Sequence, residues 1–457
     1  MKKQMAALLA SIMALQLVAC GSAAGNATQS AKEATTAAEA KETEAASAAA
    51  DSTGDEPVTI RLSWWGGDSR HEKTLEAVDK FMEAYPNIKV ECEYGAWNGW
   101  TEKISTSLVA GASADVMQTN WNWLYQFSAD GSKYVDLNDY ADIFNNFEDY
   151  DKATLETCVV AGKQQAIPIS TAGKIFYWNK TTFDKAGIAI PTTFDELTAA
   201  GETFKEKLGD DYYPIALFEY ERFLLMVYYL ESKYEKPWAV DNQCNYTVEE
   251  LTEGLEWINS LEEHHVLPSI EYLKGQGVDT IEKNPDWACG KYAGFFEWDS
   301  AQKKFADGLQ EGQEFVLGDY ITGFGKKVAG MYKISQAWTV AESSQHKKEA
   351  AMLVNFLVSD PEAVKLLGVE RGVVVNKAAE KILEEDGQLN GLACEGNKLA
   401  MENANYPLDP NFENSALKDT TGSYCTTMES LSYGDDPAEL AQNLLDDINS
   451  VYAENAY

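Results

Sequence analysis

The chain has 457 residues, with 37 Lys and Arg against 73 Asp and Glu, so its formal net charge is −36. This acidity argues against a nucleic-acid partner, because neutralising phosphates requires clustered Lys and Arg. Apolar residues make up 45% and aromatic residues 11% of the chain, which excludes a disordered acidic chain and provides material for packed cores. At about 100–200 residues per domain, the length predicts two or three domains or lobes.

The N-terminus predicts export. Two lysines, Lys2 and Lys3, precede an apolar run from Met5 to Val18, which is shorter than the roughly 20 residues that span a bilayer and has the form of a secretory signal. The run ends in Leu17-Val18-Ala19-Cys20, which resembles a bacterial lipobox. We therefore expect a lipoprotein signal peptide over residues 1–19 and lipidation of Cys20; the alternative is an ordinary signal peptide with a chance cysteine.

The segment after Cys20 is predicted to be a disordered tether. Residues 21–56 are nearly all Ala, Ser, Thr, Gly, Glu and Lys and include no aromatic residue, so they cannot bury a core. Residues 20–56 would then hold a globular body, beginning near Pro57, on the outer face of the cytoplasmic membrane. The expected localisation is the cell surface.

The other six cysteines are expected to be buried free thiols, although an exported protein permits disulfides. No C-x-x-C pair exists, which argues against a zinc or redox site. The four histidines offer little for metal or triad chemistry, and no cofactor motif is found. The six cysteines are Cys92, Cys158, Cys244, Cys289, Cys394 and Cys425.

The first part of the body alternates predicted strands and helices. Strand-forming residues fill 59–65, 88–94 and 115–118, and apolar residues recur at helical spacing in 72–85 and from 103 to 109. This β-α-β-α-β order predicts a parallel sheet with helices on its faces. Ligands of such sheets bind beyond the carboxyl ends of the strands.

Those strand ends hold half of the twelve tryptophans. An indole ring offers a flat apolar face and an N–H donor, which suits a pyranose ring, while neighbouring polar side chains suit the hydroxyl groups. The alternative is that these indoles are core material. The six residues are Trp64, Trp65, Trp97, Trp100, Trp121 and Trp123.

Further elements follow in the same mixed pattern. Strands are predicted at 165–170 and 174–179 around a turn, at 294–298, and as a pair within 328–340. Helices are predicted from 194, over 219–234, 248–263 and 347–358, and in the chain after 376.

The order of several short motifs across some 400 residues resembles the extracellular solute-binding proteins of ABC importers, in the maltose-binding-protein-like carbohydrate family. Each motif is weak alone. The motifs are Ser63-Trp64-Trp65-Gly66-Gly67, Tyr85-Pro86-Asn87-Ile88, Ala114-Asp115-Val116-Met117, Ala166-Ile167-Pro168-Ile169, Tyr177-Trp178-Asn179-Lys180, Pro191-Thr192-Thr193-Phe194-Asp195-Glu196-Leu197 and His346-Lys347-Lys348-Glu349-Ala350-Ala351.

The resemblance implies an α/β fold of the type II periplasmic-binding-protein class, with a ligand cleft between two lobes and a hinge that the chain crosses several times. The first lobe would comprise 57–168 and 297–343, and the second 172–295 and 344–457. The crossings would lie near 168–173, 296–298 and 342–347.

The strand ends and the resemblance together give a set of expected ligand contacts. By resemblance, the loop from Asn120 to Trp123 is a sugar-contacting loop and Trp298 an aromatic platform of the second lobe. Arg371 could contact sugar hydroxyls or a carboxylate of the ligand; the alternative is that it forms a structural salt bridge. The full set is Trp65, Asp68, Arg70, His71, Trp97, Asn120, Trp121, Trp123, Trp178, Trp298, Gln336 and Arg371.

The expected function is a monomeric, lipid-anchored binding protein that delivers an oligosaccharide to ABC permease subunits and is not an enzyme. One alternative is a surface glycoside hydrolase that uses Glu297 and Asp299, which flank Trp298, as its two carboxylates. Another is the same fold with a phosphorylated polyol or a peptide as ligand. The strand-end loops supply mainly Arg70 as a cation, which favours a neutral sugar.

Overall fold

The computed structural model describes residues 57–97 and 99–457. The predicted signal peptide, Cys20 and the tether lie outside the described residues. Among the described residues, no helix is long and apolar enough to cross a membrane.

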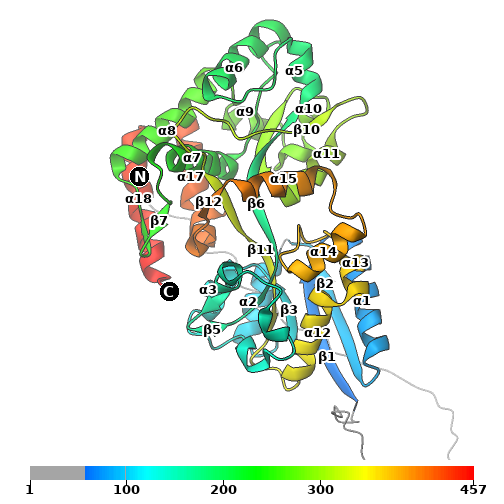
Figure 1. The fold of residues 1–457 in the computed structure, drawn as a ribbon. Coiled ribbons are helices and arrows are strands. Elements are labelled where there is room, and N and C mark those ends of the chain that lie inside the picture. Colours follow the sequence, from blue (N-terminus) through cyan, green and yellow to red (C-terminus); the bar gives the residue numbers. More distant parts are fainter. Residues whose placement is uncertain (1–56, 98) are drawn as a thin grey trace, which may run out of the picture. The chain divides into compact units, whose positions relative to one another are not determined.

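The predicted β-α-β-α-β order opens the first lobe (Figure 1). β1 pairs in parallel with β2 and with β3, so the carboxyl ends of the three strands lie at one edge. Ile60, Leu62 and Trp64 on one face of β1 are fully buried, and from Leu62 to Trp65 the strand is buried on both faces. The elements are β1 (Val58–Trp65), α1 (Asp68–Ala84), β2 (Ile88–Gly95), α2 (Trp100–Val109), β3 (Val116–Thr119), α3 (Asn122–Ser128), η1 (Leu137–Tyr140), η2 (Asn145–Phe147), α4 (Lys152–Glu156), β4 (Val159–Val160) and β5 (Lys163–Gln164).

Two long antiparallel strands, β6 (Ile167–Asn179) and β11 (Gly330–Val340), run from one lobe into the other. The far half of β11 pairs with β3 in the first lobe, and the far half of β6 pairs with β9 (Gly294–Trp298) and β10 (Phe315–Leu317) in the second. The sheet order is β10-β6-β11-β3-β1-β2. One continuous sheet therefore joins the lobes.

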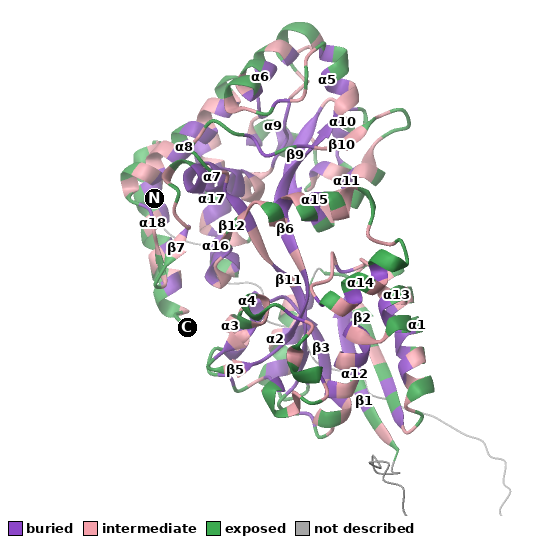
Figure 2. Ribbon diagram, in the orientation of Figure 1, coloured by how far each residue is buried: buried purple, intermediate pink, exposed green. Residues whose placement is uncertain are grey.

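The second lobe is mainly helical. Its largest core cluster surrounds α7, of which only the ends are partly exposed (Figure 2). α6 and α8 each begin with a capping box, formed by Thr193 with Glu196 and by Thr247 with Glu250. The remaining elements are α5 (Lys180–Ala186), α6 (Phe194–Leu208), α7 (Glu219–Tyr234), β7 (Ala239–Val240), β8 (Gln243–Cys244), α8 (Val248–Glu263), α9 (Ile270–Gly275), η3 (Ile281–Lys283), α10 (Pro285–Ala288), η4 (Asp299–Ala301), α11 (Gln302–Gly308), α15 (Gly391–Glu402), β12 (Ala404–Pro407), η5 (Pro410–Glu413), α16 (Ser415–Lys418), α17 (Ser423–Ser432) and α18 (Pro437–Glu454).

The lobe boundaries differ from the expected ones. Residues 297–329 lie in the second lobe rather than the first, because β9 and β10 pair with the far half of β6. α12 (Lys347–Ser359) and α13 (Pro361–Leu367) belong to the first lobe rather than the second. Their apolar faces complete its core, where Phe356 packs edge-on against Phe81.

The hinge crossings also differ in part. The first lies in β6, where residues 168–173 pair with β11. The second lies in β11, not near 296–298, and the third lies between α14 (Lys377–Glu385) and α15, not near 342–347. The predicted strand pairs at 165–179 and 328–340 are wrong, since β6 and β11 are each one continuous strand.

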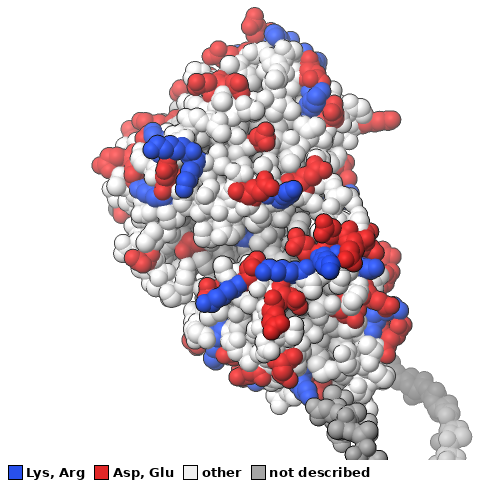
Figure 3. Space-filling view, viewed as in Figure 1, with Lys and Arg blue, Asp and Glu red and all other residues white. Residues whose placement is uncertain are grey.

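The six described cysteines are free thiols. Cys158 and Cys425 are buried, whereas Cys289 is exposed, so the expectation of uniformly buried thiols is wrong for that residue. Asp and Glu side chains are spread over the face of the body shown in Figure 3.

Asp299 ties the hinge to α15. Its Oδ2 accepts hydrogen bonds from the Gly173 amide of β6 at 3.3 Å and from Asn397 Nδ2 at 2.6 Å. Asn397 Nδ2 also donates to the Thr171 carbonyl at 3.3 Å. Burial of the carboxyl raises the pKa of Asp299 to about 7, although these hydrogen bonds oppose the rise.

We predict that Asp299→Asn changes how stability depends on pH. A raised folded-state pKa means that folded Asp299 keeps a proton which the unfolded chain loses above about pH 4, so this group lowers stability as pH rises towards 7. The free energy of unfolding of the variant minus that of the parent, measured by urea unfolding, should therefore be more positive at pH 8 than at pH 5. If variant and parent differ in unfolding free energy by the same amount at both pH values, this account of Asp299 is contradicted.

Gly173 is the hinge residue at which a side chain has no room. A Cβ there would lie 2.3 Å from the Cβ of Ala400 in α15, so the glycine continues β6 under a helix rather than making the predicted turn. Gly173→Ala should lower the free energy of unfolding by about 1–3 kcal/mol through overpacking. Gly275→Ala is the control, because its Cβ meets nothing within 4 Å; equal stability of the two variants would refute the tight contact.

Candidate ligand-binding site

The two lobes face each other across a pocket of about 460 Å³. The first lobe contributes the end of β2, α2 and α3, and the second contributes η5 and α16. The lining residues are Trp97, Gly99, Thr101, Glu102, Ser105, Asn120, Asn122, Trp123, Gln126, Phe127, Glu413, Ser415, Lys418 and Asp419.

Two tryptophans, Trp97 and Trp123, line one wall of this pocket, and Trp65 packs against both of them. The rings of Trp97 and Trp123 stack with centroids 5.6 Å apart and planes inclined by 10°, and Trp65 lies 5.2 Å from each. Trp65 and Trp123 are buried, whereas Trp97 is 42% exposed. The wall therefore presents one free indole, held by two buried ones, at the carboxyl ends of β1 and β2 where the parallel sheet predicts a ligand.

Two amides of the first lobe reach across the pocket. Asn120 Nδ2 donates to Glu413 Oε2 at 3.4 Å, and Asn122 Nδ2 donates to the Glu413 carbonyl at 3.4 Å. Both asparagines are buried. One glutamate of η5 thus receives both of these hydrogen bonds from the first lobe.

Three lysines, which we call the lysine cluster, lie on the second-lobe side and in the hinge strands. Lys333 Nζ pairs with Glu413 and lies 4.4 Å from the ring centre of Trp298. Lys174 Nζ is 2.8 Å from Glu297 Oε1 and 5.0 Å from the same ring centre. The third lysine, Lys418, lies 3.6 Å from Glu413 Oε2.

The charges in this region stabilise one another. Burial acts to raise the pKa of Glu413, but the charges of Lys333 and Lys418 outweigh it and lower the pKa to about 2. Burial lowers the pKa of Lys333, opposed by Glu413. The pKa of Glu297 is also lowered, against its own burial, by Lys174. Trp298 therefore lies between two ionised pairs.

The structure brings together only part of the expected contact set. Trp97, Asn120 and Trp123 line the pocket described above, whereas Trp65 packs behind the two tryptophans and Trp298 does not line the pocket. Trp121 is buried in the core cluster of the second lobe, although its ring centre is 5.8 Å from Lys333 Nζ.

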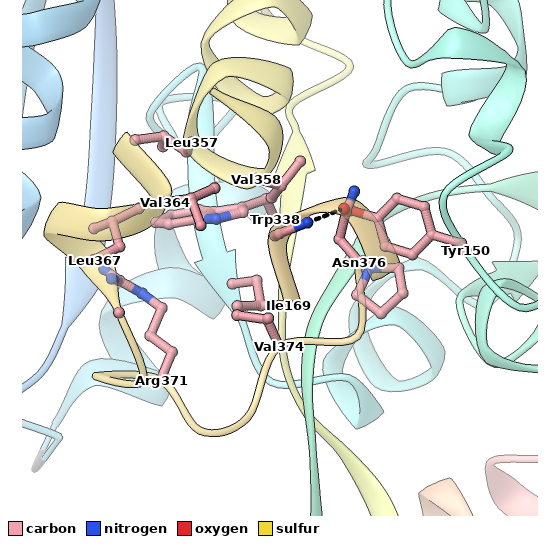
Figure 4. Close-up of a pocket in the computed structure, with 13 residues that line it drawn as sticks. Tyr150, Ile169, Trp338, Leu357, Val358, Val364, Leu367, Arg371, Val374 and Asn376 are labelled. Carbon is pink, nitrogen blue, oxygen red and sulfur yellow. Dashed lines mark hydrogen bonds between the residues drawn. The ribbon is translucent and has the colours of Figure 1, made fainter. Parts of the chain in front are cut away.

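Two expected contacts lie away from the interlobe pocket. Trp178 is fully buried in the second-lobe core, parallel to Phe176 and edge-on to Phe183. Arg371 is buried in the first lobe, where it donates to Gln118 Oε1 at 2.8 Å and Thr74 Oγ1 at 2.9 Å. It lines a separate, mostly apolar cavity (Figure 4), so it contacts neither the interlobe pocket nor a carboxylate partner among the described residues.

Four other expected contacts lie beside the pocket and do not line it. Arg70 donates to Gln336 Oε1 at 3.4 Å and to the carbonyls of Trp65 and Glu370. His71 Nδ1 accepts the Trp64 indole N–H at 3.1 Å. Asp68 begins α1 and is exposed.

The sequence reasoning missed the lysine cluster, Glu297 as its partner, and Glu413. These residues are far apart in the chain: the pairing of β6, β9 and β11 brings Lys174, Lys333 and Glu297 together, and η5 and α16 add Glu413 and Lys418. One signal was present: Lys174 is the only charged residue in the β6 sequence, and a lysine inside a buried strand requires a partner. The preference for a neutral sugar rested on the strand-end loops alone and did not include these three lysines, which come from β6, β11 and α16.

The two carboxylates of the glycosidase alternative have other partners. Glu297 is paired with Lys174, and Asp299 with Gly173 and Asn397. Neither lines the pocket of Trp97 and Glu413, although Asp299 lines a second cavity together with Glu370 and Gly372. Among the described residues, no group of three or more His, Cys, Asp or Glu is arranged to hold a metal ion.

Comparison with known proteins places this geometry in a family. A periplasmic solute binding protein from Pectobacterium atrosepticum is 34% identical, with a TM-score of 0.82, and the match covers 88% of this chain and 100% of the other. A periplasmic oligogalacturonide binding protein from Yersinia enterocolitica, solved with saturated digalacturonic acid, is 32% identical, with a TM-score of 0.80 and the same coverage.

Matches to curated relatives are shorter. The diacetylchitobiose binding protein of Streptomyces coelicolor is 27% identical over 161 residues, which are 35% of this chain and 36% of that protein. The chain spans about a third of the length of the curated relatives it matches. The family model described as "bacterial extracellular solute-binding protein" matches residues 67–364. The two lobes, the hinged sheet and the interlobe pocket agree with this match. The match shows that the chain belongs to the bacterial extracellular solute-binding proteins.

Proposed function

We propose that this protein captures an oligosaccharide containing uronic acid residues between its lobes and delivers it to the permease subunits of an ABC importer. The observation that carries the proposal is the lysine cluster beside the interlobe pocket: Lys418 lines the pocket together with Glu413, and behind them Lys174 Nζ and Lys333 Nζ lie 5.0 and 4.4 Å from the ring centre of Trp298. An aromatic face suits the apolar face of a pyranose, and an ammonium group suits its carboxylate.

The rest of the site suits the same ligand. Trp97 offers a second indole face on the first lobe, and Asn120 and Asn122 offer amide groups for hydroxyls. The chain is about one third identical, over nearly its whole folded body, to the Yersinia protein whose title names digalacturonic acid. This similarity supports an acidic sugar over the neutral oligosaccharide expected from the strand-end loops.

The other candidate ligands and the enzymatic alternative have less support. A phosphorylated polyol would be favoured by arginines or a helix N-terminus in the pocket, and no arginine lines it. Catalysis would need two carboxylates on either side of a bond, and Glu297 and Asp299 are held by other groups. A binding protein accounts for the site without a chemical step.

We propose that hinge motion about β6 and β11 closes the lobes on the ligand, so that ligand binding increases the population of the closed form recognised by the permease. The protein would act as a monomer held at the outer face of the membrane through lipidated Cys20. In cells grown with a palmitate analogue, the full-length protein should become labelled. The Cys20→Ala variant should not, because it lacks the thiol that would carry the acyl chains. Equal labelling of both would overturn the anchoring proposal.

Calorimetric titration of the folded body tests the ligand. Saturated digalacturonate should bind, whereas maltose, xylobiose, cellobiose and mannobiose at equal concentrations should bind much more weakly or not at all. Binding of any neutral sugar with higher affinity than digalacturonate would refute the uronate proposal.

Two variants show whether that binding uses the interlobe pocket. Trp97→Ala should weaken digalacturonate binding by about tenfold, because it removes a stacking face. Tyr433→Ala is the matched control, since Tyr433 is also an exposed aromatic residue but lies in α17's C-cap, outside the pocket lining. If both variants bind like the parent protein, the ligand does not contact the Trp97 wall.

A further inference from the structure

Glu413 occupies an unusual position for an acidic residue of a sugar pocket. It is buried, at the end of η5, and lines the interlobe pocket. Its Oε1 accepts from Lys333, while its Oε2 accepts from Asn120 and lies 3.6 Å from Lys418 Nζ. One carboxylate therefore uses two of the three lysines of the cluster and an amide of the opposite lobe.

This arrangement presents a problem for an acidic ligand. The three lysines of the cluster face two carboxylates, Glu297 and Glu413. An incoming carboxylate would meet ammonium groups whose charge is already largely neutralised. If it approached Lys333 while Glu413 stayed in place, two carboxylates would share one site, and like charges that close are strongly disfavoured.

We propose that Glu413 is an internal substitute for the ligand's carboxylate. In the empty protein it pairs with Lys333 and Lys418; when a uronate binds, the ligand carboxylate takes over these two lysines and Glu413 turns into the open pocket that it lines. The inference rests on the proposed function and deepens it, because Glu413 then sets the selectivity of the site. A neutral sugar has no charge with which to displace Glu413 from Lys333.

The exchange also links ligand binding to the contact between the lobes. Asn120 Nδ2 donates to the same carboxylate, so displacement of Glu413 frees this first-lobe amide for a ligand hydroxyl. The Asn122 hydrogen bond goes to the Glu413 carbonyl and need not break. One side-chain rotation of Glu413 would thus release a lysine pair and an amide together.

A fixed structural role for Glu413 predicts the opposite effect of its removal on ligand affinity. If Glu413 were a fixed counter-ion that keeps Lys333 charged and oriented, removal of its charge would weaken ligand binding. If it competes with the ligand, removal of its charge would strengthen binding, because two ammonium groups would be left without a protein partner.

The test is calorimetric titration of Glu413→Gln with saturated digalacturonate at low and high salt. Glutamine keeps the length and a carbonyl oxygen for Asn120 but removes the charge. We expect affinity to rise by about tenfold at low salt, with a steeper decrease on adding salt, and the weak binding of neutral disaccharides to stay unchanged. Unchanged or weaker digalacturonate binding by the variant would overturn the role of Glu413.

Two further variants keep the test independent of folding and of net charge. Glu342→Gln removes the same charge from an exposed ion pair with Lys347 outside the pocket, and it should bind like the parent protein. An equal gain in Glu342→Gln would mean that overall charge, not Glu413, controls affinity, and would overturn the inference. Glu413→Asp keeps the charge but shortens the reach to Lys333; it should bind more tightly than the parent and less tightly than Glu413→Gln, and parent-like affinity would contradict the exchange.

The outcomes separate the two proposals. If neither the parent nor Glu413→Gln binds digalacturonate, the proposed uronate function fails and the role of Glu413 fails with it. If the parent binds digalacturonate and Glu413→Gln gains nothing, the function stands and only the inference is overturned.

Discussion

The antiparallel pairing of β6 with β11 is the interaction on which the rest of the structure depends. These two strands pass from one lobe to the other, so their shared hydrogen bonds form the hinge as well as the centre of the sheet. The register shifts around Gln336 mark irregular pairing at the crossing. The same pairing places Lys333 opposite Ala172, and the pairing of β6 with β9 places Lys174 opposite Trp298. The hinge and the cation-lined part of the site are therefore built from the same strands.

Burying lysines at the hinge costs free energy of desolvation, and this cost explains the carboxylates that lie beside them. A lysine that is 1% exposed, as the Lys174 side chain is, requires a charged partner. Glu297 and Glu413 supply such partners, so the empty protein tolerates the lysines that an acidic ligand would use. On this account Glu297 and Glu413 keep the buried lysines paired in the empty protein, and Glu413 competes with the acidic sugar until the ligand carboxylate replaces it.

The sequence predicted the first lobe well because its signals are local. Alternating apolar residues in 59–65 and helical spacing in 72–85 depend only on neighbours in the chain, and the tryptophans at the strand ends follow from that topology. The lobe boundaries and the lysine cluster depend on contacts between distant segments. α12 completes a core begun by β1, strand pairing brings Lys174 and Lys333 together, and Lys418 joins them from α16 through Glu413. Gly173 resembled a turn residue, but the approach of α15, not a change of direction, requires the glycine. Trp178 lies one residue before the end of β6, and its burial is decided by helices that follow it.

The most direct test of the account is a crystal structure of the protein grown with saturated digalacturonate. The account predicts a sugar ring against Trp298, a ligand carboxylate within hydrogen-bond distance of Lys333 Nζ, and the Glu413 side chain rotated away from that lysine. A ligand seated elsewhere, or one bound between the lobes with the Lys333–Glu413 pair intact and its carboxylates in solvent, would contradict it.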